Sequence, residues 1–183
     1  ATQGVFYPRF SRALLDEYLA ELEVPAGERF ESMSLGQKKK AAIAFALATG
    51  TPLLLMDEPT NGLDIVGRAQ FRRLMQRPEH AGRAVLISTH QAHDLESILS
   101  HIWFIDQGRL ALSARMDDLA RWLHMGLASD ESALAQAGGA LLYQERIGHQ
   151  TAYVALRRES GAQAPGSGVQ LELLYKALSL NRD

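Results

Sequence analysis

Apolar and polar residues alternate with a helical period near the start of the chain. Residues 11–24 are predicted to form an amphipathic helix, which Pro25 and Gly27 end. A second helix is predicted over residues 35–49, behind Ser34, which is a favoured residue type at helix N-termini. The body of this second helix, AAIAFALA, is apolar on every side, so we expect it to be buried.

The next part of the chain alternates between short apolar runs and helical segments. Residues 53–56 form an apolar run that ends at Asp57, and residues 84–89 form a second run that ends at His90. Such continuous runs are typical of strands buried on both faces of a parallel sheet. The pattern therefore predicts an α/β fold with a mainly parallel sheet. A third strand is predicted over residues 102–105, and helices over residues 65–76 and 91–100.

The pattern changes after Ser113, and the last part of the chain is predicted to be a small α+β appendage. Two antiparallel strands are expected over residues 140–144 and 151–156, because apolar residues recur at every second position around a glycine turn. Helices are predicted over residues 116–125, 130–137 and 169–180, and a small-residue linker over residues 161–168. The predicted division is 1–50, 51–113 and 114–183.

Composition narrows the possible functions of these 183 residues. A net charge of −2 gives no bulk attraction to nucleic acid. The sequence has no cysteine, which excludes disulfides, thiolate metal sites and a cysteine nucleophile. No apolar run approaches the roughly 20 residues that span a bilayer, and the N-terminus lacks the pattern of a secretion signal. We therefore expect any membrane role to be peripheral and to act through a partner.

Two adjacent carboxylates, Asp57 and Glu58, follow the first predicted strand. Open α/β sheets bind ligands at the carboxyl ends of their strands. In nucleotide hydrolysis, an aspartate at such a place can hold Mg²⁺ through water, and a second carboxylate can act on the attacking water. The alternative is that Asp57, Glu58 and Pro59 simply end the strand in a turn.

Three further segments surround this pair in the sequence. Ser34 to Gln37 open the second helix, where free backbone N–H groups can meet phosphate oxygens. Asn61, Gly62, Leu63 and Asp64 form a tight turn downstream, and His90 ends the next strand on the edge that carries Asp57. Each segment alone has an ordinary structural explanation, but their order and spacing together point to a nucleotide site.

This combination resembles the ABC ATPase family. MSLGQ, Met33 to Gln37, is similar to the family's signature motif LSGGQ and departs from it at Leu35. Leu53 to Asp57 resembles the Walker B strand, Glu58 stands at the catalytic glutamate position, and His90 matches the switch histidine. Asn61 to Asp64 resembles the D-loop, usually SALD, with departures at the first two residues. The resemblance covers residues 7–114.

The resemblance implies a role for each of these residues. Asp57 would organise Mg²⁺, Glu58 would act on the attacking water, and His90 would contact the γ-phosphate of ATP. A second ATPase subunit would face this one head to tail, so that Ser34, Leu35, Gly36 and Gln37 hold that phosphate from across the dimer. Asp64, in the D-loop Asn61–Gly62–Leu63–Asp64, would couple the two sites.

The family's phosphate-binding loop has no counterpart in the sequence. The pattern G-x-x-x-x-G-K-[ST] does not occur, and Gln3 lies too near the start to be assigned to the Q-loop. We therefore expect a partial P-loop NTPase core without Walker A or Q-loop, completed by a longer protein or by another chain. The missing strand should leave apolar surface exposed, and the 183 residues alone should be inactive.

The resemblance favours a transporter subunit that joins transmembrane permease subunits at the cytoplasmic face of a bacterial membrane. One alternative is an ABC-type ATPase that acts on ribosomes or DNA, and another is a non-catalytic fragment that only dimerises. Lys38, Lys39 and Lys40 are interpreted as a solvated face, so no nucleic-acid partner is expected. His90 and His93 could be metal ligands, but no third ligand is evident beyond the nearby His101.

Overall fold

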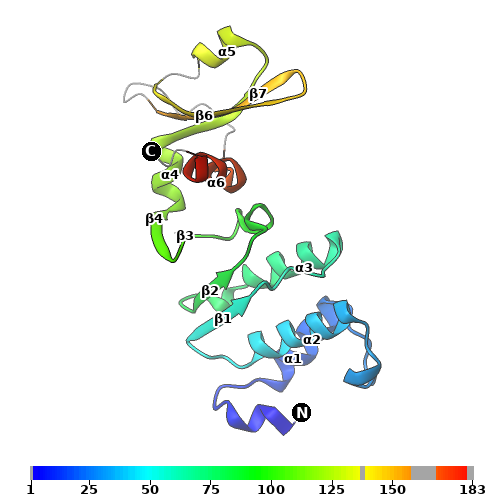
Figure 1. Cartoon of the computed structure of the whole chain (residues 1–183). Coiled ribbons are helices and arrows are strands. Elements are labelled where there is room, and N and C mark those ends of the chain that lie inside the picture. Colours follow the sequence, from blue (N-terminus) through cyan, green and yellow to red (C-terminus); the bar gives the residue numbers. More distant parts are fainter. Residues whose placement is uncertain (1, 137–138, 158–167, 181–183) are drawn as a thin grey trace. The chain divides into compact units, whose positions relative to one another are not determined.

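The computed structural model describes residues 2–136, 139–157 and 168–180. The chain divides into two compact units, Ala1–Asp94 and Leu95–Asp183, which are considered separately (Figure 1). These units do not test the functional division at residues 50 and 113, which stays a prediction. The predicted linker, residues 161–168, lies outside the described residues except for Gly168.

The first unit combines helices with a pair of parallel strands (Figure 1). Its elements are η1 (Thr2–Phe6), α1 (Arg12–Glu21), η2 (Phe30–Ser32), α2 (Leu35–Ala48), β1 (Leu53–Asp57), α3 (Ile65–Met75), η3 (Pro78–His80), β2 (Ala84–Ser88) and η4 (Ala92–Leu95). Helix α1 packs against α2, and the Ser11 N–H donates to the carbonyl of Ala48 at 3.0 Å. Both predicted helices of this region are therefore confirmed.

Strands β1 and β2 pair in parallel, with Leu53 opposite Ala84 and Asp57 opposite Ser88. The prediction that both faces of these strands are buried is wrong. Leu54 and Met56 are buried, whereas Leu53 and Leu55 are 54% and 66% exposed. Alternation along β1 thus leaves one face without a covering layer among the described residues. The expected exposed apolar surface is confirmed.

The segment after β2 is less helical than the sequence indicated. A helix was expected over residues 91–100, but only the 3₁₀ turn η4 forms, over Ala92–Leu95. The Thr89 hydroxyl accepts a hydrogen bond from the Gln91 N–H at 3.0 Å, which offers the backbone an alternative to the first helical turn.

The second unit contains two antiparallel sheets. Its elements are β3 (His101–Asp106), β4 (Arg109–Arg115), α4 (Met116–Trp122), β5 (Leu123–Ala128), α5 (Glu131–Gln136), β6 (Leu141–Ile147), β7 (Gln150–Leu156) and α6 (Leu171–Leu180). Strand β3 pairs with β4 in a hairpin, which the prediction of a mainly parallel sheet did not anticipate. The mixed α/β class itself is confirmed.

The three-stranded sheet has the order β5-β7-β6 and carries helices on opposite faces (Figure 1). Helix α5 packs against Ala128, Tyr153 and Ala155, while α6 contacts β6 and β7 from the other side. The predicted antiparallel strand pair is confirmed. The helix predicted over residues 116–125 forms as α4 but ends at Trp122, because residues 123–128 pair with β7 instead and tertiary pairing outweighs local propensity.

Two apolar residues of α3 test the burial described for the first unit. Leu74 is fully buried, whereas Ile65 on the same helix is 86% exposed. Leu74→Ala should lower the free energy of unfolding by about 2–5 kcal/mol, since it removes buried methyl groups and leaves a cavity. Ile65→Ala should change it by less than about 0.5 kcal/mol. Urea unfolding followed by circular dichroism measures both, and equal losses would contradict the described burial.

Candidate functional site

The parallel pairing of β1 with β2 brings three of the predicted site residues, Asp57, Glu58 and His90, to one edge of the first unit. The register sets Asp57 beside Ser88, so Glu58 follows one strand while Thr89 and His90 follow the other. The Glu58 N–H continues the ladder by donating to the Ser88 carbonyl at 2.9 Å. These five residues, Asp57, Glu58, Ser88, Thr89 and His90, are called the strand-end cluster below.

The Glu58 carboxylate is the centre of this cluster. One oxygen accepts hydrogen bonds from the His90 Nδ1–H at 2.7 Å and from the His90 backbone N–H at 2.9 Å. The other oxygen accepts from the Thr89 hydroxyl at 3.1 Å. The imidazole is the more exposed partner, with 64% of the His90 side chain accessible against 27% of the Glu58 side chain. The carboxylate is therefore fixed in direction while remaining accessible to solvent.

The Glu58 backbone has an uncommon conformation. Its φ of 44° lies in the left-handed region, which a residue other than glycine adopts at a cost of about 1–3 kcal/mol. The Asn61 N–H donates to the Glu58 carbonyl at 3.2 Å, and the Lys39 ammonium of α2 donates to the same oxygen. These contacts hold the turn that aims the Glu58 side chain at β2.

The same hydrogen bonds control the ionisation of Glu58. Burial raises the pKa of its carboxyl, but the bonds from the His90 ring, the Thr89 hydroxyl and the His90 backbone together hold it below its ordinary value of 4.5. Glu58 is consequently a carboxylate at neutral pH, able to accept a proton or to orient a polar hydrogen.

Asp57 is exposed and accepts a hydrogen bond from the Ser88 hydroxyl through one oxygen. A carboxylate is a preferred ligand of Mg²⁺, an ion that keeps several waters and takes only one or two carboxylates from a protein. Asp57 therefore fits a magnesium ion held with nucleotide phosphates. Within the described residues, no group of three or more His, Asp or Glu side chains could hold a metal ion, and this includes any group containing His90 and His93.

The start of α2, Ser34 to Gln37, is called the signature turn here. Ser34 and Gln37 form a capping box: the Ser34 hydroxyl oxygen accepts from the Gln37 N–H at 3.2 Å, and the Gln37 side chain accepts from the Ser34 N–H at 2.7 Å. The N–H groups of Leu35 and Gly36 have no acceptor inside the helix. These donors and the Ser34 hydroxyl proton fit a phosphate oxygen.

The turn Asn61–Asp64 lies next to the signature turn. A Cβ atom added to Gly36 would stand 3.6 Å from the Gly62 carbonyl oxygen. Gly62 has a φ of +80°, which explains glycine at this position of the turn. Asn61 and Gly62 are exposed, whereas Leu63 is buried and anchors the turn.

Asp64 ends this turn by capping α3. Its carboxylate accepts a hydrogen bond from the Gly67 N–H at 2.7 Å, so one of its oxygens is occupied in capping the helix. Arg68, one turn further, pairs with Asp94 at 2.6 Å. This ion pair ties α3 to the segment that follows His90.

Sequence reasoning missed Thr89 and Lys39 as parts of the cluster. Thr89 stands immediately before His90, so its position at the end of β2 was a usable signal. Lys39 was interpreted as part of a solvated face together with Lys38. In the structure, Lys39 reaches the Glu58 carbonyl and Lys38 donates to the Glu31 carbonyl at 3.1 Å. The lysines are bound to the backbone of their own chain.

Comparisons with known proteins show what this chain is similar to. The family model described as "AAA domain, putative AbiEii toxin, Type IV TA system" matches residues 18–93. The chain is 29% identical over 114 residues to the ABC transporter ATP-binding protein YtrB of Bacillus subtilis, which covers 62% of this chain and 39% of YtrB. It is 34% identical over 87 residues to the lantibiotic transport ATP-binding protein SrtF of Streptococcus pyogenes, which covers 48% of this chain and 38% of SrtF.

A solved ATP-binding subunit of an ABC transporter has 25% identity and a TM-score of 0.54, covering 66% of this chain and 52% of that one. The homologues are thus ABC transporter ATP-binding proteins and the structural neighbours are ABC ATPase cassettes. The resemblance to ABC-type ATPases is confirmed, as is the partial ABC ATPase core. The chain spans about two fifths of the length of the curated relatives YtrB and SrtF.

The lowered pKa of Glu58 predicts a pH-dependent stability. The ionised carboxylate stabilises the fold above its ordinary pKa of 4.5, and this contribution is lost as pH falls through the lower folded-state value. Glu58→Gln should cost about 0.5–1.5 kcal/mol of unfolding free energy at pH 7 and progressively less below pH 4.5. Urea unfolding across this range measures the difference.

The exposed Glu31 supplies a matched control, because no hydrogen bond or ion pair of its side chain is described. Glu31→Gln should show no such pH-dependent difference. A cost of Glu58→Gln that stays constant from pH 7 to pH 3 would show that its hydrogen bonds do not favour the ionised form.

Proposed function

We propose that this chain is part of the ATP-hydrolysing subunit of an ABC transporter, which energises transport through membrane partner subunits. The observation that carries the proposal is the 2.7 Å contact between Glu58 and His90 beside Asp57, at the carboxyl ends of two parallel strands. Nucleotide ligands bind at this edge of open α/β sheets. The names of the bacterial relatives support the transport assignment.

Glu58 is the residue proposed to act on the attacking water. Its pKa is held below the ordinary value, so it is ionised at pH 7 and can accept a hydrogen bond from water. His90 and Thr89 orient the carboxylate by donating to both of its oxygens. Asp57, one residue earlier, is proposed to hold Mg²⁺ through water, and the ion would neutralise charge on the phosphates of ATP.

His90 is proposed to contact the γ-phosphate. Its Nδ1–H donates to Glu58, and its Nε2 lies 3.3 Å from the Gln91 amide nitrogen. In the neutral imidazole this network makes Nε2 an acceptor. To donate to a phosphate oxygen, the ring must gain a proton at Nε2 and release Gln91. The exposed ring has room for this change.

The signature turn is proposed to act on ATP held by a second subunit in a head-to-tail dimer. Leu35 is 77% exposed, and the N–H groups of Leu35 and Gly36 remain available to phosphate oxygens. Ser34 would donate its hydroxyl proton, and Gln37 would exchange its capping bond for a contact with the nucleotide. The turn Asn61–Gly62–Leu63–Asp64, which adjoins Gly36, would couple the two ATP sites of the dimer.

The proposed location is the cytoplasmic face of a membrane, in contact with permease subunits. None of the helices in the described part of the chain has the length and apolarity of a membrane-spanning segment. Attachment would therefore use a surface of this subunit against its membrane partners.

A second candidate function is that the chain dimerises and donates its signature turn without hydrolysing ATP. The observation in its favour is that no Walker A pattern occurs in the 183 residues. We therefore expect these residues alone to show no ATP turnover above background, because phosphoryl transfer needs the P-loop backbone and lysine. Magnesium-dependent hydrolysis by the purified chain, abolished by Glu58→Gln, would overturn this expectation.

The catalytic role of Glu58 is testable in an ATPase that joins these residues to a Walker A segment. Glu58→Gln keeps the size of the side chain but removes its basic carboxylate. Hydrolysis should fall by about 10²- to 10⁴-fold while nucleotide binding survives and an ATP-bound dimer accumulates. Asp57→Asn should instead weaken the Mg²⁺ site itself, so that turnover needs more Mg²⁺. Turnover and ATP-dependent dimerisation, measured together, decide the question: near-normal hydrolysis by Glu58→Gln would remove it from catalysis.

A further inference from the structure

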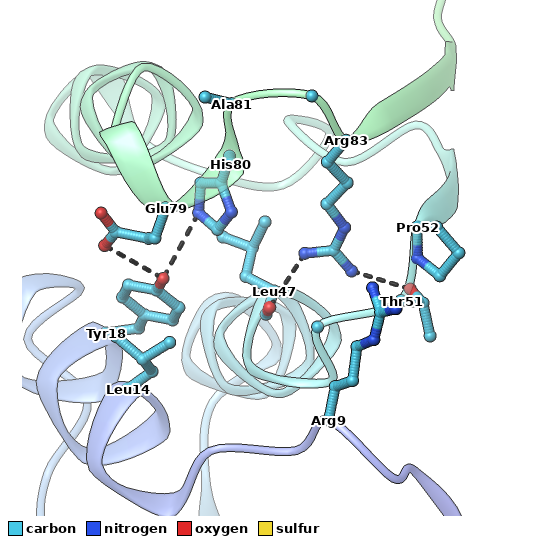
Figure 2. Close-up of a pocket in the computed structure, with 12 residues that line it drawn as sticks. Arg9, Leu14, Tyr18, Leu47, Thr51, Pro52, Glu79, His80, Ala81 and Arg83 are labelled. Atoms are coloured by element: carbon cyan, nitrogen blue, oxygen red, sulfur yellow. Dashed lines mark hydrogen bonds between the residues drawn. The ribbon is translucent and has the colours of Figure 1, made fainter.

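A hollow of the first unit lies at the opposite end of the strands from Glu58. It has a volume of about 180 Å³ and is bordered by Pro52 and Arg83, which directly precede β1 and β2. Five-residue strands separate it from the strand-end cluster by about 16 Å. Its other walls come from α1, the end of α2 and η3 (Figure 2). The proposed ATPase chemistry uses none of these residues.

Two arginines give this hollow, called the basic cavity here, its charge. The Arg83 guanidinium donates to the carbonyls of Leu47 and Ala46 at 2.9 and 3.2 Å and to the Thr51 hydroxyl at 2.8 Å. All of these acceptors are neutral, and the Arg83 Nε–H is buried without a hydrogen-bond partner. No carboxylate of the described residues pairs with Arg83, although burial lowers its pKa and so opposes its charge.

Arg9 adds a second positive charge from the other side. Figure 2 shows the Arg9 and Arg83 side chains reaching toward Thr51 from different elements. Among the described residues, none forms an ion pair with Arg9. Two guanidinium groups therefore converge on one cavity, and no carboxylate of the described residues pairs with either of them.

Glu79, the acidic residue of the lining, offsets only part of this charge. Glu79 accepts hydrogen bonds from Arg77 at 3.1 Å and from the Tyr18 hydroxyl at 3.2 Å. His80, also in the wall, is buried, and its Nε2 lies 3.4 Å from the same hydroxyl. Arg77 lies outside the lining and also pairs with Glu17 and Glu21 at 2.6 Å, so it does not cancel Glu79 alone. The lining itself sets two arginines, Arg9 and Arg83, against the one carboxylate of Glu79, which leaves an excess of positive charge.

We propose that the basic cavity binds a small oxyanion, a molecule presenting a phosphate or carboxylate group to Arg9 and Arg83. The planar guanidinium fork recognises both groups through charge-assisted hydrogen bonds. The cavity is much larger than the ~10–15 Å³ that one water occupies, so an oxyanion has room. Because α1, the end of α2 and residues 50–52 form walls of the cavity, the bound anion would brace the helix that begins with the signature turn.

Titration of the 183-residue chain with inorganic phosphate, followed by ¹⁵N NMR at constant ionic strength, tests the site. The backbone amides of Gly50, Thr51 and Gly82 should shift in a saturable way, because these residues line the cavity. Succinate in a separate titration distinguishes a carboxylate ligand from a phosphate. Saturation by either anion supports the site and identifies the preferred group.

Two arginine variants separate binding in the cavity from general attraction to charge. Arg9→Gln should weaken binding by about tenfold or more, since it removes a charge-assisted bond. Arg12→Gln, which alters an exposed arginine paired with Asp16 on α1, should leave the affinity unchanged. Thermal unfolding without phosphate checks that Arg9→Gln is folded. Shifts that never saturate with either anion, or equal affinities of wild type and Arg9→Gln, would overturn the proposal.

Discussion

The register between β1 and β2 is the constraint on which the candidate site depends. Asp57 faces Ser88 across the parallel ladder, and this pairing brings Glu58 to the end of the strands beside Thr89 and His90, to which it is hydrogen-bonded. Side chains alternate between the two faces of a strand, so a slip of one residue would send Leu54 and Met56 to the exposed face. The burial of those two side chains therefore specifies the chemistry at the end of the strand.

Contacts from outside the strands hold this arrangement in place. Lys39 links α2 to the Glu58 carbonyl, so the helix that starts with the signature turn is bonded to the turn that carries the proposed catalytic carboxylate. Arg68 of α3 holds the segment after His90 by forming an ion pair with Asp94. A single unit consequently presents two chemically different surfaces, the strand-end cluster and the signature turn.

The sequence was sufficient to predict the helices and strands whose local residue pattern favours the same structure that they form in the folded chain. Ser34 indicated a capped helix, and the structure shows that it caps α2 in a capping box with Gln37. The runs before Asp57 and before His90 indicated strands that end side by side, which the structure confirms. These signals were readable because capping, apolar runs and turn residues act over a few neighbouring positions.

Features that depend on distant contacts could not be predicted in this way. Exposure of Leu53 and Leu55 depends on which layers cover the strands, and a continuous apolar run carries no information about that. Strand β5 was mistaken for the end of a helix because its pairing partner, β7, lies later in the chain. The convergence of Arg9 with Arg83 joins residues far apart in the chain, to which no local pattern refers.

The register can be measured directly by NMR of the 183-residue chain in solution. The account predicts cross-strand nuclear Overhauser effects that align Asp57 with Ser88, an effect between the His90 ring and the Glu58 side chain, and slow exchange of the Glu58 amide hydrogen, which is bonded to the Ser88 carbonyl. Cross-peaks in a register shifted by one residue, or a freely exchanging Glu58 amide, would contradict it.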